Sequence, residues 1–112
     1  MAIATARTKV NEIAVSLGLT EGELFQQALV SFLTEKKRRT LQLKLEILAR
    51  YGADSVAELE SKIAQGVVVE HPAWEDLIVA ENLNARLREL DDHLDDLRSP
   101  ENYRPQSVSL AM

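Results

Sequence analysis

The chain lacks most of the side chains on which catalysis and secretion depend. Its 112 residues include no cysteine, which excludes disulfides, zinc–thiolate sites and thiol nucleophiles. Aromatic residues make up only 4% of the chain, so its core has to be built from aliphatic side chains. It contains no long apolar run and no basic start followed by an apolar stretch. We therefore expect no transmembrane helix, no signal peptide and a cytoplasmic location.

The few chemistry-bearing residues are scattered. The two histidines, His71 and His93, lie in no motif that sets a base beside a nucleophile, and no glycine-rich phosphate loop is present. Glu89, His93 and Asp96 share a helix face, but one histidine with carboxylates is a poor transition-metal site. We expect a solvated charged face there, and hence no enzyme activity, no metal and no cofactor.

Hydrophobic residues recur every three to four positions along most of the chain. This period predicts an all-α fold with about four helices, two of them long. The predicted helices cover about residues 8–17, 20–51, 55–66 and 72–98. Thr20 with Glu23, and Ser55 with Glu58, have the spacing of capping boxes at two helix starts. A kink near Thr40 stays open, because the apolar stripe loses its phase there.

The last predicted helix has a leucine seam with alternating spacings of three and four residues. A chain with two long helices has few layers to cover both apolar stripes, so we predict a homo-oligomeric helical bundle. The outward face of this helix is acidic, and Trp74 is either a core residue or an interface anchor. The predicted partner-binding residues are Trp74, Leu77, Leu83, Leu87, Leu90, Leu94, Asp91 and Asp95.

The charge of the chain is divided between its halves. Residues 1–50 hold eight basic and five acidic residues, whereas residues 51–112 hold five basic and thirteen acidic residues. We therefore divide the chain into a basic helical part, residues 1–51, an acidic partner-binding part, residues 52–98, and a flexible tail, residues 99–112. The candidate DNA contacts are Arg7, Lys9, Lys36, Lys37, Arg38 and Arg39. Two alternatives for residues 36–39 remain open, a solvated helix segment and a docking place for the acidic half of another chain.

Two DNA-binding arrangements fit the first part. Residues 13–24 resemble a helix-turn-helix, with the small Ala14 at the helix crossing and Gly18 in the turn. Glu21 and Glu23 at the start of its second helix are unfavourable next to phosphates. In the ribbon-helix-helix alternative, residues 3–9 form a short strand that places Arg7 and Lys9 on one face.

At the level of pattern, the sequence resembles small bacterial and archaeal type II antitoxins. The resemblance covers roughly residues 10–97, and its segments are LGLTEGELFQQALVSFL at 17–33, ARYG at 49–52, SVAELESKIAQG at 55–66 and HPAWED at 71–76. It implies an N-terminal part that dimerises and binds operator DNA. It also implies an acidic C-terminal part that occludes a basic toxin. The alternative is a homo-oligomeric scaffold that binds no DNA.

Overall fold

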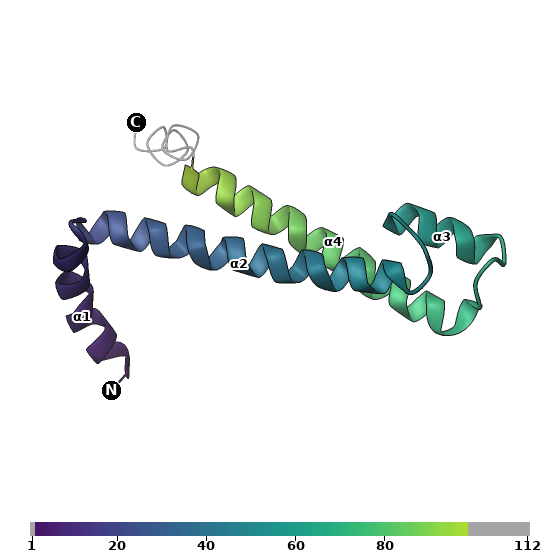
Figure 1. The fold of residues 1–112 in the computed structure, drawn as a ribbon, viewed down its shortest axis with the longest axis horizontal. Helices are drawn as coiled ribbons and strands as arrows, with labels where there is room; N and C mark the ends of the chain where they lie inside the picture. The colour runs from purple at the N-terminus through teal and green to yellow at the C-terminus, as the bar shows by residue number, and fades with distance from the viewer. Residues whose placement is uncertain (1, 99–112) are drawn as a thin grey trace, which may run out of the picture.

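The computed structural model describes residues 2–98 of the chain, which form four α-helices and no strand. The helices are α1 (Ala2–Leu17), α2 (Glu21–Ala49), α3 (Val56–Ala64) and α4 (Glu70–Arg98) (Figure 1). The all-α prediction with two long helices is confirmed. The predicted tail, residues 99–112, lies outside the described residues.

The possible N-terminal strand is a wrong prediction. Residues 3–9 belong to α1, which begins six residues before the predicted start. Alanine, the strongest helix former, occupies positions 2, 4 and 6. A strand at this place has no partner strand in the described part of the chain, and a single strand is not stable alone. The ribbon-helix-helix arrangement is therefore not formed, because the strand that would contact bases is a helix.

Local capping sets the limits of α2 and α3. The Thr20 side chain accepts a hydrogen bond from the Glu23 amide at 3.0 Å, and the Glu23 carboxylate accepts one from the Thr20 amide at 2.9 Å. This confirms the first capping box. Ser55 caps α3 through the Glu58 amide, but the Glu58 carboxylate accepts from the amide of Asp54 instead of that of Ser55. The second predicted box therefore has its Ser55 bond in place, but its return bond comes from the residue before the N-cap.

The kink left open near Thr40 is not observed. Helix α2 continues through this residue, whose buried hydroxyl donates to the Lys36 carbonyl at 2.8 Å. In α4, by contrast, His71 has non-helical dihedral angles, so the regular helix starts at Pro72. Proline suits the first turn of a helix, where its missing N–H has no partner to lose.

Helices α2 and α4 form an antiparallel hairpin (Figure 1). Gln26 near the start of α2 donates to the carbonyl of Leu97 near the end of α4, whereas Lys44 donates to Asn84 near its middle. Helix α3 covers the end of the hairpin. The core cluster at this end consists of Leu48, Ala53, Leu59, Ile63, Ala73 and Leu77. The predicted boundary at 51/52 falls in the α2–α3 turn, and the segments on its two sides pack against each other in this core.

The molecule is elongated, with extents of 58 × 39 × 24 Å. Its radius of gyration is 20.3 Å, against about 13 Å for a compact domain of this length. Helix α1 projects sideways from the far end of α2 (Figure 1). In such a shape large parts of each helix have no neighbour among residues 2–98. These uncovered faces are the candidate functional surfaces.

Candidate interaction surfaces

The leucine seam of α4 is closed within the chain. Leu77, Leu90 and Leu94 are buried, and Leu83 and Leu87 are half-buried. The seam packs along the α2–α4 hairpin and into the core beside α3. Of the predicted partner-binding leucines, none is fully exposed in this conformation. With the hairpin closed, these leucines offer little free surface, and another face of α4 is the more accessible one.

That other face of α4 is apolar at one end and acidic at the other. Trp74 and Ile78, four residues apart, are 43% and 53% exposed. The Trp74 indole N–H donates to the Glu70 carboxylate at 2.9 Å, which leaves the ring on the surface. Further along the same helix face come Asp92 and Asp96, both exposed. Helical spacing thus brings an aromatic anchor and carboxylates onto one continuous stripe.

The carboxylates on α4 differ in whether they have a partner. Asp91 is half-buried, and its carboxylate Oδ1 forms an ion pair with Lys37 Nζ at 2.6 Å. Within residues 2–98, Asp92, Asp95 and Asp96 are exposed and form no ion pair. Asp91 therefore belongs to the intrachain interface, and the other three carboxylates are available to a cation from outside.

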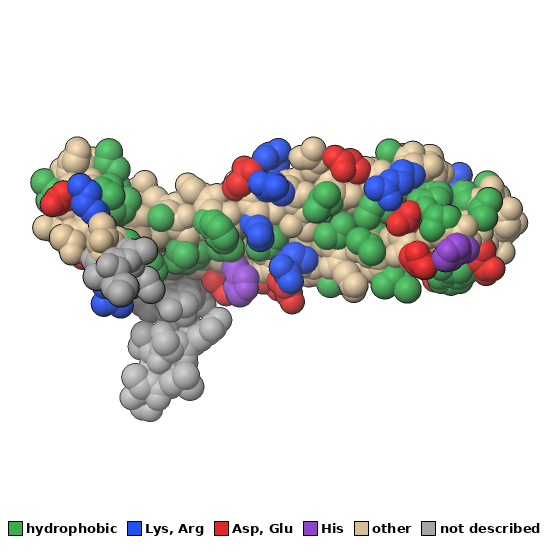
Figure 2. Space-filling view, turned by 90° about the horizontal axis from the view of Figure 1, so that it is seen from below, with side chains coloured by type: hydrophobic (Ala, Val, Ile, Leu, Met, Phe, Trp, Pro, Cys, Tyr) green, Lys and Arg blue, Asp and Glu red, His purple; other side chains and the backbone are tan. Residues whose placement is uncertain are grey.

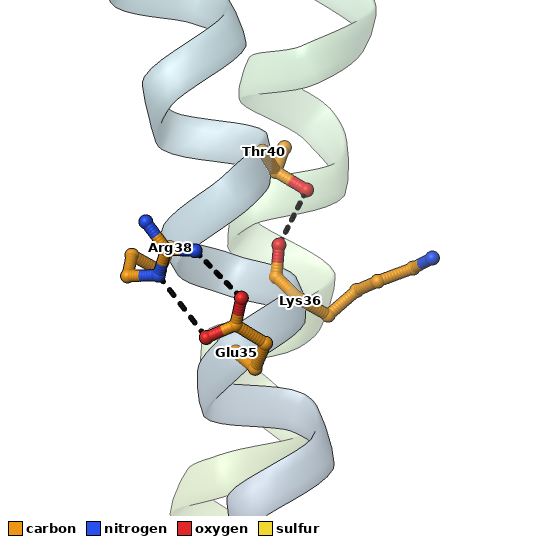
Figure 3. Close-up of polar contacts among 4 residues, drawn as sticks. All are labelled: Glu35, Lys36, Arg38 and Thr40. Atoms are coloured by element: carbon orange, nitrogen blue, oxygen red, sulfur yellow. Dashed lines mark hydrogen bonds and ion pairs between the residues drawn. The ribbon is translucent and has the colours of Figure 1, made fainter.

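The basic segment of α2 is partly neutralised. Lys37 contacts Asp91, and the Arg38 guanidinium donates two hydrogen bonds to the Glu35 carboxylate, at 3.1 and 2.6 Å (Figure 3). These bonds lower the pKa of the Glu35 carboxyl and raise that of the Arg38 guanidinium, because they stabilise the charged forms. Among residues 36–39, only Lys36 and Arg39 form no ion pair with the described chain.

The remaining candidate DNA contacts lie on α1. Lys9 forms an ion pair with Glu12 at 2.9 Å, one turn along the same helix. Arg7 and Lys9 are separated from the basic segment by the α1–α2 turn and about 15 residues of α2, roughly 22 Å of helix. The face in Figure 2 accordingly shows Lys and Arg side chains interspersed with acidic and apolar ones, not one continuous basic patch.

The α1–α2 corner has the local geometry predicted for residues 13–24. Ala14 is buried where the helices meet, Gly18 has a positive φ of 74°, and the Leu19 amide donates to the Ala14 carbonyl at 2.8 Å. Gln26, the first amide side chain on α2, is already bound to the Leu97 carbonyl at 2.7 Å. Of the two glutamines near the start of α2, only Gln27 has no hydrogen bond of its side chain to the described residues.

Among the described residues, no group of three or more His, Asp or Glu side chains is placed so that it could hold a metal ion. His71 and His93 lie 22 residues apart along α4, about 33 Å at 1.5 Å per residue. The two histidines therefore do not share one site. In the same part of the chain, no helix is both long and apolar enough to cross a membrane.

A polar cluster at the α3 end was not anticipated from the sequence. The Tyr51 hydroxyl donates to the Asp76 carboxylate, which also lies 3.4 Å from the Arg50 guanidinium. The hydrogen bond to Asp76, together with partial burial, raises the pKa of the Tyr51 phenol. The pairing joins residues 25 positions apart, so only the closure of the hairpin reveals it.

Over residues 1–102 the sequence matches the Uncharacterized protein MJ0235 family. The chain belongs to this family. No curated protein and no solved structure matches it. The matched range includes all four helices, so one family covers both the hairpin and the projecting α1. Because the description of this family gives no function, the exposed surfaces are the remaining source of functional information.

Proposed function

We propose that the chain is an antitoxin-like protein that binds and occludes a basic toxin through the outward face of α4. The observation that carries the proposal is the exposed stripe of Trp74, Ile78, Asp92 and Asp96. Its two aspartates form no ion pair within residues 2–98, while the leucine seam beneath it is closed. Such a protein acts by stoichiometric binding and not by turnover.

The two ends of this stripe suit different steps of binding. Tryptophan is enriched among the residues that dominate binding energy, because it buries a large rigid surface. The unpaired carboxylates attract a basic partner at a distance and orient its approach. A toxin of matching chemistry offers an apolar pocket for Trp74 and, about 30 Å away at the other end of α4, a group of Lys or Arg side chains.

Operator binding by the N-terminal half remains a prediction, and the contacts support it less well. Three of its six candidate cations are engaged by Glu12, Asp91 and Glu35. Arg7, Lys36 and Arg39 are left to contact phosphate. If they do, binding to the chain's own promoter falls steeply with salt concentration, and substitution of Lys36 and Arg39 by Gln makes this dependence shallower.

The test is affinity purification of the tagged chain from its native cells, with wild type, Trp74→Ala and Leu45→Ala compared. Leu45 is the control, since it is an exposed apolar residue on a different helix, 50% exposed against 43% for Trp74, and belongs to neither proposed surface. We expect wild type and Leu45→Ala to retain a stoichiometric small basic protein, and Trp74→Ala to bind it about 30-fold more weakly. Expression of that protein alone should arrest growth, and co-expression of the chain should restore it.

The antitoxin proposal is wrong if the chain recovers no protein other than itself. It is also wrong if the recovered protein is harmless when expressed alone. In the first case the scaffold alternative, in which the helices serve self-assembly, becomes the better account.

A further inference from the structure

We propose that one face of α2 is a self-complementary docking surface for a second copy of this chain. The face is made of six residues at helical spacing and is called here the symmetric face. Its members are Glu21, Phe25, Ala28, Leu29, Phe32 and Lys36. The proposal does not depend on the proposed function, because it uses a different helix.

Residues 2–98 do not cover the symmetric face. Phe25 and Phe32 are 66% and 62% exposed, and only Leu29 is half-buried. The residues of α2 that contact α4, among them Gln26 and Lys37, lie about a quarter of a turn or more around the helix. Two exposed phenylalanines one heptad apart are a typical helix-packing stripe, and no helix of residues 2–98 packs on this one.

The order of residues along this face identifies the occupant. Each end of the face carries a charged residue, Glu21 at one end and Lys36 at the other. Four positions inward from each charged residue lies a phenylalanine, Phe25 or Phe32. The pair Ala28 and Leu29 lies at the centre. An antiparallel copy related by a two-fold axis between these central residues sets Phe25 against the partner's Phe32. The same axis sets Ala28 against the partner's Leu29. Every apolar position therefore meets an apolar one, as a two-fold interface requires.

The charges of the symmetric face have opposite signs at its two ends. The two-fold axis that matches the phenylalanines also sets Glu21 against the partner's Lys36, and does so twice. Within the described residues neither Glu21 nor Lys36 forms an ion pair, so both are available. A parallel copy in the same register would instead oppose glutamate to glutamate and lysine to lysine, which is unfavourable. The charge order thus selects the antiparallel arrangement.

The area of the face suits a weak dimer. A buried aromatic side chain covers 150–250 Å², so the two phenylalanines and their neighbours supply about 500 Å² per chain. The total of about 1,000 Å² is at the lower limit for a specific interface. Ala28 at the centre lets the two helix axes approach closely. We therefore expect a reversible dimer with a Kd of about 1–100 µM.

Sedimentation of the purified full chain tests the proposal by charge reversal. Wild type should reach twice the 12.5 kDa chain mass as concentration rises. Glu21→Lys and Lys36→Glu should each raise the dimer Kd about tenfold or more, because each opposes like charges at both ends of the interface. The double variant, Glu21→Lys with Lys36→Glu, should return to within about threefold of wild type. Circular dichroism of each variant separates loss of association from loss of fold.

Cross-linking provides an independent measurement. The chain contains no cysteine, so Ala28→Cys introduces a single thiol beside the proposed axis. Mild oxidation should join two copies at this position. Ala57→Cys, which is also at an exposed position but lies on α3, should remain monomeric under the same conditions.

Three results overturn the proposal. A chain that stays monomeric at 100 µM, the upper end of the expected Kd range, has no such interface. A dimer that ignores both single reversals, or that the double reversal does not restore, uses another face. Equal cross-linking of Ala28→Cys and Ala57→Cys points to random collision. None of these outcomes bears on Trp74 and toxin binding, so the two proposals fail separately.

Discussion

Leu77 and Ile78 are adjacent on α4 and should respond to truncation in opposite ways. Leu77 is only 1% exposed and packs in the core cluster with Leu48 and Leu59, whereas Ile78 is 53% exposed. Leu77→Ala removes buried methyl groups and leaves a cavity, which costs about 3 kcal/mol of unfolding free energy. At about 4–8 °C per kcal/mol, the midpoint of thermal unfolding falls by about 12–24 °C. Ile78→Ala should change stability by less than about 0.5 kcal/mol.

Urea unfolding followed by circular dichroism measures both effects. The difference between Leu77→Ala and wild type should be the same at low and at high protein concentration, because the cavity lies within one chain. A loss that grows with concentration would mean that Leu77 packs between chains. A loss no larger than that of Ile78→Ala would refute the assignment of Leu77 to the core. In the toxin-binding assay the order should be reversed, with Ile78→Ala weakening binding.

Two further predictions concern local interactions. Thr20→Ala removes the side chain that caps α2 and should cost about 1 kcal/mol in urea unfolding, while Glu23→Ala should cost less because only its return bond to the Thr20 amide is lost. For Tyr51, the raised pKa means that the folded state favours the neutral phenol. Its stabilising contribution is complete below the unfolded-state pKa and is lost as pH rises through the folded-state value. Ultraviolet titration in a Tyr103→Phe background should show this raised pKa, and Asp76→Asn should lower it. An unchanged titration in Asp76→Asn would contradict the contact.

Much of the fold could be predicted because it depends on neighbours in sequence. The Thr20 box, the Gly18 turn and the start of regular helix at Pro72 each involve residues within one helical turn. The strand wrongly predicted at residues 3–9 failed because a strand, unlike a helix, depends on residues that are distant in sequence. A strand depends on a partner strand, which a local pattern cannot supply, while alanine-rich turns form a helix with their own hydrogen bonds.

The candidate sites were less predictable because they depend on distant contacts. The charge count marks Lys37 as a phosphate ligand and Asp91 as a partner contact, but the hairpin joins them to each other. In the same way, the leucine spacing requires that Leu90 and Leu94 be covered, and it does not say by what. Arg38, by contrast, contacts Glu35 only three positions away, a pairing that helical spacing alone permits.

By itself, then, the sequence determined that the chain is helical, where the second, third and fourth helices begin, and which stripes have to be buried. These follow from propensity, capping and a period of three to four residues, all of which act within a single helix. Only the tertiary structure decided that the leucine seam closes on α2 and that Trp74 remains on the surface. It also showed that the symmetric face of α2 is left uncovered. A periodic stripe carries no information about its partner, because hydrophobic burial is not directional and any helix of suitable shape can supply it.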